Sequence, residues 1–379
     1  MAKTESAPNL LTVRAGFIPL VDCAVLAVAR EKGFAEAHGI DLQLCKEVSW
    51  ANIRDRVNVG QFDVAHMLAG MPIAANMGIG HIKVPMIAPM ALGAGGNAIT
   101  LSYGLYESLA QLGLDLNTPL ASGDALRAVI ERRRMQGLEP LTFGMVFPFS
   151  NHNYQLRYWM AAAGIDPDCD VRLVVIPPPF MVQSLQAGQI DGFCVGEPWN
   201  TLAAKKGVGK VLLLGSSVWL EGPEKVLGMQ ESWAQNNPDV LAALLRALDQ
   251  AARWADDHAH HAELAGVLAR AEYLDVPEHY IAQALEGDLR FCTAASCDHA
   301  LWLYAQMVRW GQTLLLPSGE QAACCTYRPD LLADALGKNH VQPQISNVRP
   351  LDGVAFDPAD VAGYIAAESI KCHNFEQKK

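Results

Sequence analysis

A series of motifs occurs twice in this chain and constrains its fold more than any other feature. The clearer copy, residues 145–199, reads as strand, polar loop, helix, Gly-Ile-Asp, strand, triple proline, helix, Gly-Gln-x-Asp, strand and Gly-Glu-Pro-Trp. Strands that alternate with helices indicate a mostly parallel sheet. A weaker copy spans residues 17–72. The duplication predicts two α/β lobes with the same wiring and a cleft between them.

Two short motifs define the correspondence between the copies. Gly39-Ile40-Asp41 matches Gly164-Ile165-Asp166, and Gly60-Gln61-Phe62-Asp63 matches Gly188-Gln189-Ile190-Asp191. In each copy the first motif follows a helical stretch, where glycine in the left-handed conformation commonly ends a helix. A two-lobed protein that binds a small ligand is therefore the leading hypothesis.

Length and composition agree with a two-lobed globular protein. A chain of 379 residues is too long for one core and suits two lobes. Hydrophobic residues make up 51% and charged residues 18%, which leaves ample material for buried cores. The net charge of −11 argues against direct nucleic-acid binding, which needs a basic patch. No apolar run approaches the roughly 18–20 residues of a membrane span.

The N-terminal sequence and the cysteines bear on the cellular compartment. MAKTESAPNL has one lysine and no apolar segment, so it does not resemble a secretory signal. The nine cysteines form an odd set without regular spacing, and several, such as Cys45 and Cys194, read as small buried hydrophobes. We therefore expect a cytoplasmic protein. The alternative is a mature exported protein that has been given a new Met.

The order of predicted elements suggests that the chain crosses between the lobes twice. We predict the first part of lobe I at 11–103, lobe II at 104–225, and a return to lobe I with extra C-terminal helices at 226–370. Such a path is typical of a hinged binding protein. The predicted strands are Leu11–Ile18, Leu42–Val48, Phe62–Leu68, Lys83–Met90, Leu141–Phe147 and Val208–Leu214. Predicted helices include Cys23–His38, Trp50–Val57 capped by Ser49, Leu105–Arg134, Pro238–Asp257, His261–Glu272, His279–Leu285, His299–Thr313, Arg328–Leu336 and Pro358–Ala367.

Equivalent loops of the two copies are predicted to face one another. Ligands of parallel α/β sheets bind beyond the carboxyl ends of the strands. Six loops follow such ends: Pro19–Asp22, Glu47–Trp50, Ala69–Pro72, Phe149–Asn153, Pro177–Phe180 and Gly196–Trp199. The helix that opens at Ser150 offers free N–H groups and a positive dipole, which favour an anion. Pro198 is predicted at a first helical position, where Gly196 presents its backbone to a ligand.

Four side chains in or near these loops have both an ordinary and a functional interpretation. His152 reads either as an exposed first-turn histidine or as a ligand donor, and Trp50 as helix–sheet packing or a ligand wall. Lys225, in LEGPEKVLGM, reads as a solvated loop lysine or a cationic ligand group. Asn97 lies where a glycine-rich run becomes a strand. That run, Gly93–Gly96, lacks the full dinucleotide fingerprint, so we expect no nucleotide or other cofactor.

Several motifs together resemble one family. These are EVSWANIRD around Trp50, the GNAI run, HxxxxRYWxAAxGIDP, VIPPPxMVxxLxxGxIDxFCVGEPW and the late TYRPDLL segment. They resemble the nitrate- and bicarbonate-binding proteins of ABC uptake systems (NrtA and CmpA type) over roughly residues 11–340. The resemblance implies a type II periplasmic-binding-protein fold, with two α/β lobes, a hinge and a ligand cleft.

The resemblance also implies a ligand set. In the nitrate-binding branch the anion is held by a Trp, a Gln, a His, a Gly backbone and a Lys. Matching motifs place these at Trp50, Asn97, His152, Gly196 and Lys225, with Asn97 a departure that shortens the amide. Lysine supplies the positive charge, and charge-assisted hydrogen bonds are the stronger ones. The bicarbonate branch has an acidic residue at the lysine position that serves a metal, so nitrate or nitrite is favoured and no metal is expected.

A cytoplasmic location would change the role of such a cleft. The same architecture resembles the cytoplasmic nitrate-sensing regulators of bacterial nitrate assimilation (NasS type). These hold an ANTAR-type RNA-binding antiterminator (NasT type) and release it when nitrate binds. The resemblance implies a nitrate sensor that regulates transcription antitermination of nitrate assimilation genes. Thermodynamic linkage requires that the anion and the antiterminator weaken each other's binding when they prefer different arrangements of the two lobes.

Other classes of function remain open. The main alternative is the solute-binding subunit of a nitrate or bicarbonate ABC transporter. An enzyme on the same fold, like the thiamine-pyrimidine synthases, is suggested by the Cys324-Cys325 pair. Neighbouring cysteines rarely bridge comfortably, so we expect no enzyme. His258 and His261 form a possible metal-ligand pair, but two ligands at a polar helix end are more often a solvated face.

Overall fold

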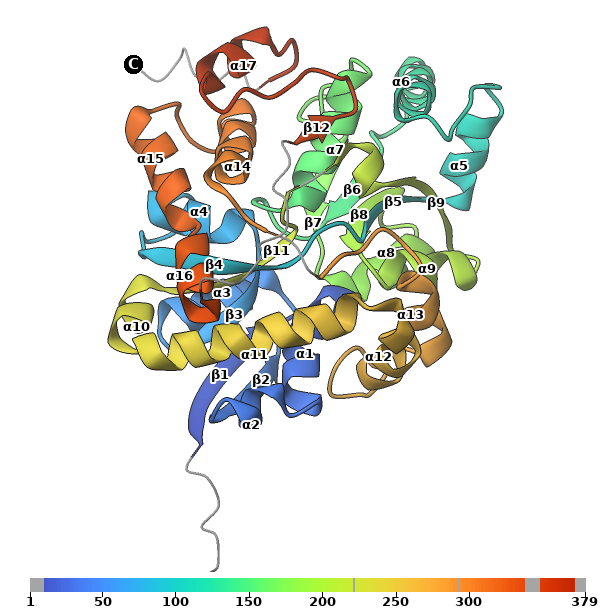
Figure 1. Cartoon of the computed structure of the whole chain (residues 1–379). Coiled ribbons are helices and arrows are strands. Elements are labelled where there is room, and N and C mark those ends of the chain that lie inside the picture. Colours follow the sequence, from blue (N-terminus) through green and yellow to red (C-terminus); the bar gives the residue numbers. More distant parts are fainter. Residues whose placement is uncertain (1–9, 221, 292–293, 338–347, 372–379) are drawn as a thin grey trace, which may run out of the picture.

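Two five-stranded sheets form the centres of two lobes (Figure 1). The computed structural model describes residues 10–220, 222–291, 294–337 and 348–371. The first sheet has the order β2-β1-β3-β11-β4 and the second β7-β6-β8-β5-β9. Their strands are β1 Leu11–Phe17, β2 Ile40–Lys46, β3 Val64–Leu68, β4 Met86–Gly93, β5 Asn97–Ser102, β6 Thr142–Met145, β7 Arg172–Val175, β8 Gly192–Gly196, β9 Gly209–Leu214 and β11 Lys225–Gln230. A small separate sheet pairs β10 Trp219–Leu220 with β12 Arg349–Pro350.

The two sheets have the same topology. In each, the first strand of the copy lies between the second and the third and is parallel to both. The fourth strand is antiparallel to its neighbours and comes directly from a crossing between lobes: β11 in the first sheet, β5 in the second. The predicted α/β class with two matched lobes is confirmed.

The repeated Gly-Gln-x-Asp motif has the same role in both lobes. Asp63 accepts a hydrogen bond of 2.8 Å from the backbone N–H of Arg14, and Asp191 accepts one of 2.8 Å from that of Thr142. Each aspartate thereby ties the start of the third strand to the first strand of its own sheet. The glycines that open the motif, Gly60 and Gly188, have φ values of 71° and 67°. Only glycine adopts this left-handed conformation without strain.

The lobe boundaries differ from those predicted. Residues 97–102 were assigned to lobe I, but β5 pairs with β8 and β9 in the second sheet. Lys225 was placed at the end of lobe II, but it is the first residue of β11 in the first sheet. The pattern change near Gly104 marks the start of a helix rather than the crossing. Strand partners are set by hydrogen bonds between residues that are far apart in the sequence. The local sequence pattern therefore does not reveal them.

Helices cover both sheets and continue into a C-terminal helical region. Their bounds are α1 Ala24–Glu31, α2 Phe34–Ala37, α3 Trp50–Asn58, α4 Gly70–Met77, α5 Tyr103–Ala110, α6 Pro119–Met135, α7 Asn151–Ala162, α8 Met181–Gln186, α9 Trp199–Lys205, α10 Glu231–Asn236, α11 Pro238–Asp256, α12 His261–Leu268, α13 Glu278–Ala284, α14 Cys297–Arg309, α15 Pro317–Thr326, α16 Pro329–Leu336 and α17 Val361–Ala367. Single turns of 3-10 helix lie at η1 Val21–Cys23, η2 Pro178–Phe180, η3 Gly215–Ser217 and η4 His258–His260.

Local helix signals were mostly reliable. Ser49 caps α3 as predicted, because its hydroxyl accepts a hydrogen bond from the backbone N–H of Asn52. The predicted helix Cys23–His38 is instead divided into η1, α1 and α2, with Gly33 between the last two at a φ of 71°. Apolar residues keep their helical spacing across this break, so the hydrophobic pattern of the sequence does not reveal it.

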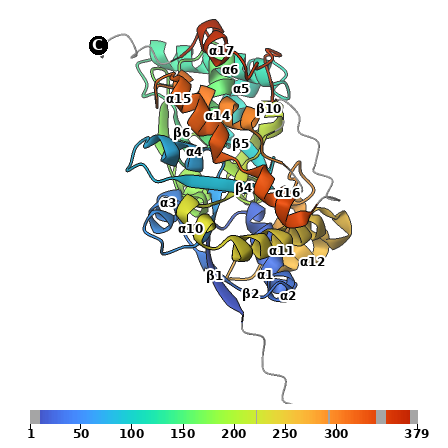
Figure 2. The same ribbon diagram turned by 60° about the vertical axis from the view of Figure 1, so that its left-hand side comes forward.

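The C-terminal helices contact both lobes. The long helix α11 packs against α1 and α2 of the first lobe, and α14 and α15 pack against α4 (Figures 1 and 2). Aromatic side chains connect α14 to the second lobe: Trp302 lies 5.9 Å from Tyr158 of α7 and 5.4 Å from Trp219, between ring centroids. Within the described residues, no helix is long and apolar enough to cross a membrane.

A disulfide that the cysteine spacing did not predict joins α14 to α15. Cys297 and Cys324 are bonded, with their Cα atoms 4.3 Å apart. Cys194 is buried as expected, whereas Cys45 is partly exposed. Cys292 and Cys372 lie outside the described residues. The partner of Cys324 is therefore Cys297, 27 residues away, rather than its neighbour Cys325.

We expect Cys297→Ser to lower the free energy of unfolding by about 3 kcal/mol, because the bond closes a loop of this length in the unfolded chain. Urea unfolding of the oxidised proteins measures the difference. Cys325→Ser, at an exposed free thiol, is the matched control and should leave stability unchanged. Equal stability of wild type and Cys297→Ser under oxidising conditions would contradict the cross-link.

Candidate functional site

A buried ionic cluster lies where the returning chain enters the first sheet. Lys225, the first residue of β11, has no solvent exposure. Its Nζ lies 2.7 Å from Oδ2 of Asp22 and 2.9 Å from Oε1 of Glu224. Asp22 belongs to η1, directly after β1, and Glu224 precedes Lys225 in the chain. The interpretation of Lys225 as a solvated loop lysine is therefore wrong.

Two aromatic side chains of the first lobe extend this cluster. His66 of β3 has Nε2 3.0 Å from Oδ1 of Asp22, and burial lowers its pKa. The ring of Trp50, at the start of α3, lies 5.7 Å from Nζ of Lys225, within cation–π range. The indole Nε1 of Trp50 is buried and has no hydrogen-bond partner in the part of the chain that the structure describes. A donor of the first lobe is thus left available beside the cation.

The second lobe contributes His152 from the first turn of α7. Ser150 caps this helix by accepting a hydrogen bond from the backbone N–H of Asn153. His152 is fully buried, and its Nε2 lies 3.6 Å from Oε1 of Glu224. Neither ring nitrogen has a hydrogen-bond partner within the described ranges. Burial and the nearby Lys225 hold the pKa of His152 well below its usual value, so the ring is neutral.

Asn97 and Gly196 face each other across the β5–β8 ladder. The Asn97 amide donates a hydrogen bond of 3.1 Å to Oε1 of Gln155, and its Oδ1 has no partner. A Cβ at Gly196 would lie 3.5 Å from Oδ1 of Asn97 and 3.7 Å from Oδ2 of Asp22. Glycine therefore keeps the space beside the cluster free of a side chain.

The Gly-Glu-Pro-Trp loop reaches the first lobe through backbone contacts. The carbonyl of Glu197 accepts a hydrogen bond of 2.8 Å from Val21, and the Trp199 indole donates one of 3.1 Å to the carbonyl of Pro19. Pro198 was predicted at the first helical position, but it is the N-cap of α9 and follows a cis peptide bond. The sequence pattern does not distinguish these neighbouring positions.

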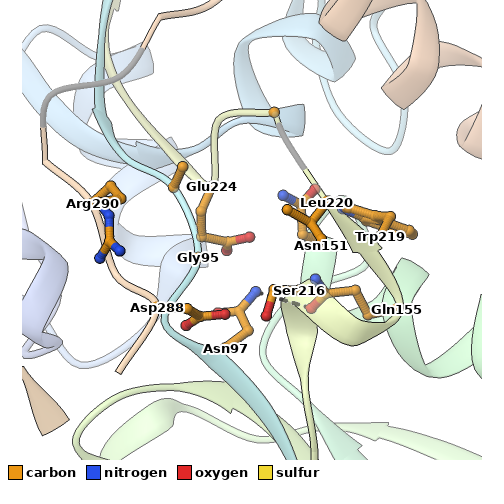
Figure 3. Close-up of a pocket in the computed structure, with 12 residues that line it drawn as sticks. Gly95, Asn97, Asn151, Gln155, Ser216, Trp219, Leu220, Glu224, Asp288 and Arg290 are labelled. Carbon is orange, nitrogen blue, oxygen red and sulfur yellow. Dashed lines mark hydrogen bonds between the residues drawn. The ribbon is translucent and has the colours of Figure 1, made fainter. Parts of the chain in front are cut away.

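A cleft of about 270 Å³ adjoins the cluster (Figure 3). Glu224 belongs to both the cleft lining and the cluster, and Asn97 also lines the cleft. Asp288 and Arg290 lie on one side of the cleft, and Gln155 and Trp219 on the other (Figure 3). The remaining lining residues are Ala94, Gly95, Asn151, Ser216, Leu220 and Gly222. Strand ends of both lobes therefore border one polar space.

All five residues that the resemblance implied lie in this region, but sequence reasoning missed their closest neighbours. Asp22, His66 and Glu224 were not predicted, although Asp22 ends a predicted facing loop and Glu224 adjoins Lys225. A histidine within the apolar strand sequence VAHML was a usable signal for His66. Among the six loops, Pro177–Phe180 contains η2 Pro178–Phe180, and Phe180 is 46% exposed.

The charge balance of the cluster differs from the prediction. Lys225 was expected to supply a positive charge to a ligand, yet one cation faces two carboxylates. Although burial opposes ionisation, Lys225 and His66 hold the pKa of Asp22 far below its usual value. Burial raises the pKa of Glu224, with Lys225 acting in the opposite direction. The lysine remains charged because these carboxylates outweigh its burial and raise its pKa.

His258 and His261 are the residues whose spacing suggests a possible metal-ligand pair. The rings of His258 and His261 lie 4.5 Å apart between centroids. Within the described ranges, no group of three or more His, Cys, Asp or Glu residues could hold a metal ion.

We expect Asp22→Asn to reduce stability at neutral pH by about 3–5 kcal/mol, because it removes one partner of the buried ion pair with Lys225 and of the contact with His66. Since the pKa of Asp22 is lowered in the folded state, its contribution is present above its unfolded pKa near 3.9 and is lost as pH falls through the folded pKa. The deficit measured by urea unfolding should therefore shrink in acid. Asp124→Asn, at an exposed ion pair with Arg127, should have almost no effect. An equal deficit at pH 7 and in strong acid would contradict the ionic role.

Comparisons with known proteins agree with this architecture. A family model described as the NMT1-like family matches residues 6–269. The chain is 32% identical over 402 residues to the nitrate/nitrite binding protein NrtA of Synechococcus elongatus, covering 96% of this chain and 88% of NrtA. It is 37% identical over 379 residues to the nitrate import ATP-binding protein NrtC of Synechocystis. That match covers 94% of this chain and 55% of NrtC, so the chain spans about half the length of this relative.

Solved structures show the same fold. The periplasmic nitrate-binding protein NrtA from Synechocystis superimposes with a TM-score of 0.85 at 28% identity, covering 96% of this chain and 100% of that chain. The alkanesulfonate-binding protein SsuA from Xanthomonas axonopodis, at 16% identity and a TM-score of 0.59, matches 82% of this chain and 96% of that chain and supports the fold alone. The predicted periplasmic-binding-protein-like fold is confirmed. This chain belongs to the NMT1-like family, together with the nitrate/nitrite binding protein NrtA.

Proposed function

We propose that this protein binds nitrate or nitrite between its two lobes. The observation that carries the proposal is a set of buried polar groups without protein partners beside a buried lysine. Among the described residues, Trp50 Nε1 and both ring nitrogens of His152 have no hydrogen-bond partner, and Lys225 lies next to both residues. Leaving a buried polar group unpaired costs about 1–3 kcal/mol. An oxyanion between these groups would accept their hydrogen bonds.

A planar monoanion suits the chemistry of the site. Its oxygens are acceptors only, whereas Trp50 offers a donor, neutral His152 offers one donor and Lys225 offers charge-assisted hydrogen bonds. Gly196 leaves room for the close approach of a small ligand, since a side chain there would meet Asn97 and Asp22. The relatives named as nitrate/nitrite binding proteins support this ligand class. Their names describe binding proteins, and we propose no catalytic step here.

Titration calorimetry with nitrate and nitrite should give micromolar-range binding, and Lys225→Ala or His152→Ala should abolish the signal. Lys32→Ala, which removes a surface ion pair with Glu263, is the matched control and should bind normally. Bicarbonate with calcium and a sulfonate serve as competing ligands. A response only to bicarbonate with calcium would overturn the ligand assignment.

Trp50→Phe isolates the unpartnered indole donor. We expect about tenfold or greater weakening of nitrate binding, because hydrogen bonds to charged groups contribute about 1.5–3 kcal/mol. Thermal stability should change little, since Nε1 has no protein partner to lose. Calorimetry and a melting curve on the same sample separate the two effects. Unchanged affinity would remove Trp50 from the ligand set.

For the biological role, we propose a cytoplasmic sensor that controls an ANTAR-type RNA-binding antiterminator and releases it when the anion binds. The NrtC match bears on this proposal, because a region similar to nearly the whole of this chain forms about half of a protein named as a nitrate import ATP-binding protein, joined to an ATP-binding function in one chain. This chain contains no G-x-x-x-x-G-K-[ST] motif, so the matched region is not a nucleotide-binding one.

Co-purification with the antiterminator tests the sensor role. The complex should form without nitrate and dissociate when nitrate is added, because nitrate and the antiterminator favour different arrangements of the two lobes. Complexes of Lys225→Ala should persist in nitrate, and Lys32→Ala should behave as wild type. Retrieval of permease components alone would overturn the sensor proposal.

The second candidate is the solute-binding subunit of a nitrate importer. Two observations favour it: the similarity to NrtA over almost the full length of both chains, and the Cys297–Cys324 disulfide. Disulfides persist mainly in oxidising compartments outside the cytosol. In vesicles that carry the importer's membrane components, this role predicts nitrate-dependent stimulation of ATP hydrolysis by the added chain. Absence of stimulation, with release of the antiterminator, would exclude it.

A further inference from the structure

We propose that anion binding at this site takes up one proton, which resides on the carboxyl group of Glu224, and that the protonated carboxyl donates a hydrogen bond to the anion. The inference rests on the proposed function and adds Glu224 to the ligand set. It follows from the arrangement of charges around Lys225, which leaves no net positive charge for a ligand.

The charge of the buried cluster is the first step. Lys225 is held between Asp22 and Glu224 at 2.7 and 2.9 Å, and all three side chains are almost completely buried. His66 and His152 are neutral, because burial lowers the pKa of both. With both carboxylates ionised, the cluster carries one net negative charge. A monoanion placed there would add a second negative charge in a space that water does not screen.

A proton resolves this conflict, and the geometry distinguishes the two carboxylates. Asp22 contacts both Lys225 and His66, so its ionised form is stabilised from two sides. Glu224 has Lys225 as its near cation, and the His152 Nε2 at 3.6 Å lies beyond hydrogen-bond distance. The opposite pKa shifts of the two groups agree with this distinction. Glu224 also lines the cleft, whereas Asp22 does not belong to its lining.

The groups that face Glu224 come from several elements. Lys225 from its own strand and Asn151 from α7 favour its ionised form, and Asp22 from η1 opposes it. His152 of α7 lies nearby and is neutral. Burial raises the pKa of Tyr327 and Cys194, Glu224 acts in the same direction, and both groups keep their protons. Arg290 and Asp288, of opposite charge, border the same cleft.

Proton balance is straightforward. The free site holds Asp22 and Glu224 as carboxylates with Lys225 protonated. On binding, one proton from solvent adds to a Glu224 oxygen, Lys225 keeps its charge and its contact with Asp22, and the new O–H donates to an anion oxygen. The anion itself is chemically unchanged, and the cluster with ligand carries the same net charge as the empty cluster.

Calorimetry of nitrate binding in buffers of different ionisation enthalpy measures the proton directly. Nitrate is a suitable probe because it carries one charge throughout the neutral range. Above the raised pKa of free Glu224, we expect uptake of one proton per nitrate and an affinity that falls about tenfold per pH unit. Binding without proton uptake between pH 6 and 9 would overturn the inference and leave the proposed function intact. No nitrate binding at any pH would overturn the proposed function itself.

Glu224→Gln mimics the protonated carboxyl in shape and charge. We expect the variant to bind nitrate with no proton uptake and no pH dependence, and to bind more tightly than wild type at high pH. Glu197→Gln is the matched control, since burial raises the pKa of Glu197 to about 7 and its carboxylate accepts a hydrogen bond from Thr201 rather than Lys225. Proton uptake should persist in that control. Uptake lost in Glu197→Gln but kept in Glu224→Gln would assign the proton to Glu197 and contradict the proposal.

Discussion

The ion pair between Lys225 and Asp22 is the interaction on which the rest of the site depends. A buried lysine is tolerated only when its charge is matched, because removing an ion from water is costly. Asp22 provides that match from η1, the turn that follows β1, and it also contacts His66 of β3. The pair therefore joins three strands of the first sheet at their shared edge. Any ligand that enters must satisfy a cluster whose charges are already paired.

The two crossings of the chain explain why this cluster lies between the lobes. β4 leads into β5 of the second sheet, and β9 leads back through β10 to β11 of the first. Asn97 and Lys225 are the first residues after these two crossings. Trp50 and Lys225 belong to the first lobe, whereas His152, Asn97 and Gly196 belong to the second. A ligand bound by both groups would link the lobes, and this coupling is common to a sensor and to a transport subunit.

Much of the architecture was predictable because it depends on local signals repeated twice. Ser49 and Ser150 cap helices as their sequence context predicts, and Asp63 and Asp191 make equivalent backbone contacts. Asn97 was identified through resemblance, but its strand was assigned to the wrong lobe. The hydrogen bonds that decide this, from β5 to β8 and β9, join residues far apart in sequence. The Cys297–Cys324 pairing escaped prediction for the same reason.

The sequence by itself determined the two-lobed α/β class and the repeated turns, since motifs and glycine conformations are properties of short segments. The set Trp50, Asn97, His152, Gly196 and Lys225 stays a prediction that the family resemblance supplied. Only the tertiary structure decided how those residues are paired. It placed Asp22 and Glu224 on Lys225, made His152 a buried neutral group and left the Trp50 indole without a partner. Burial and charge pairing depend on which distant segments meet, and these contacts place a lysine predicted as a free cation between two carboxylates.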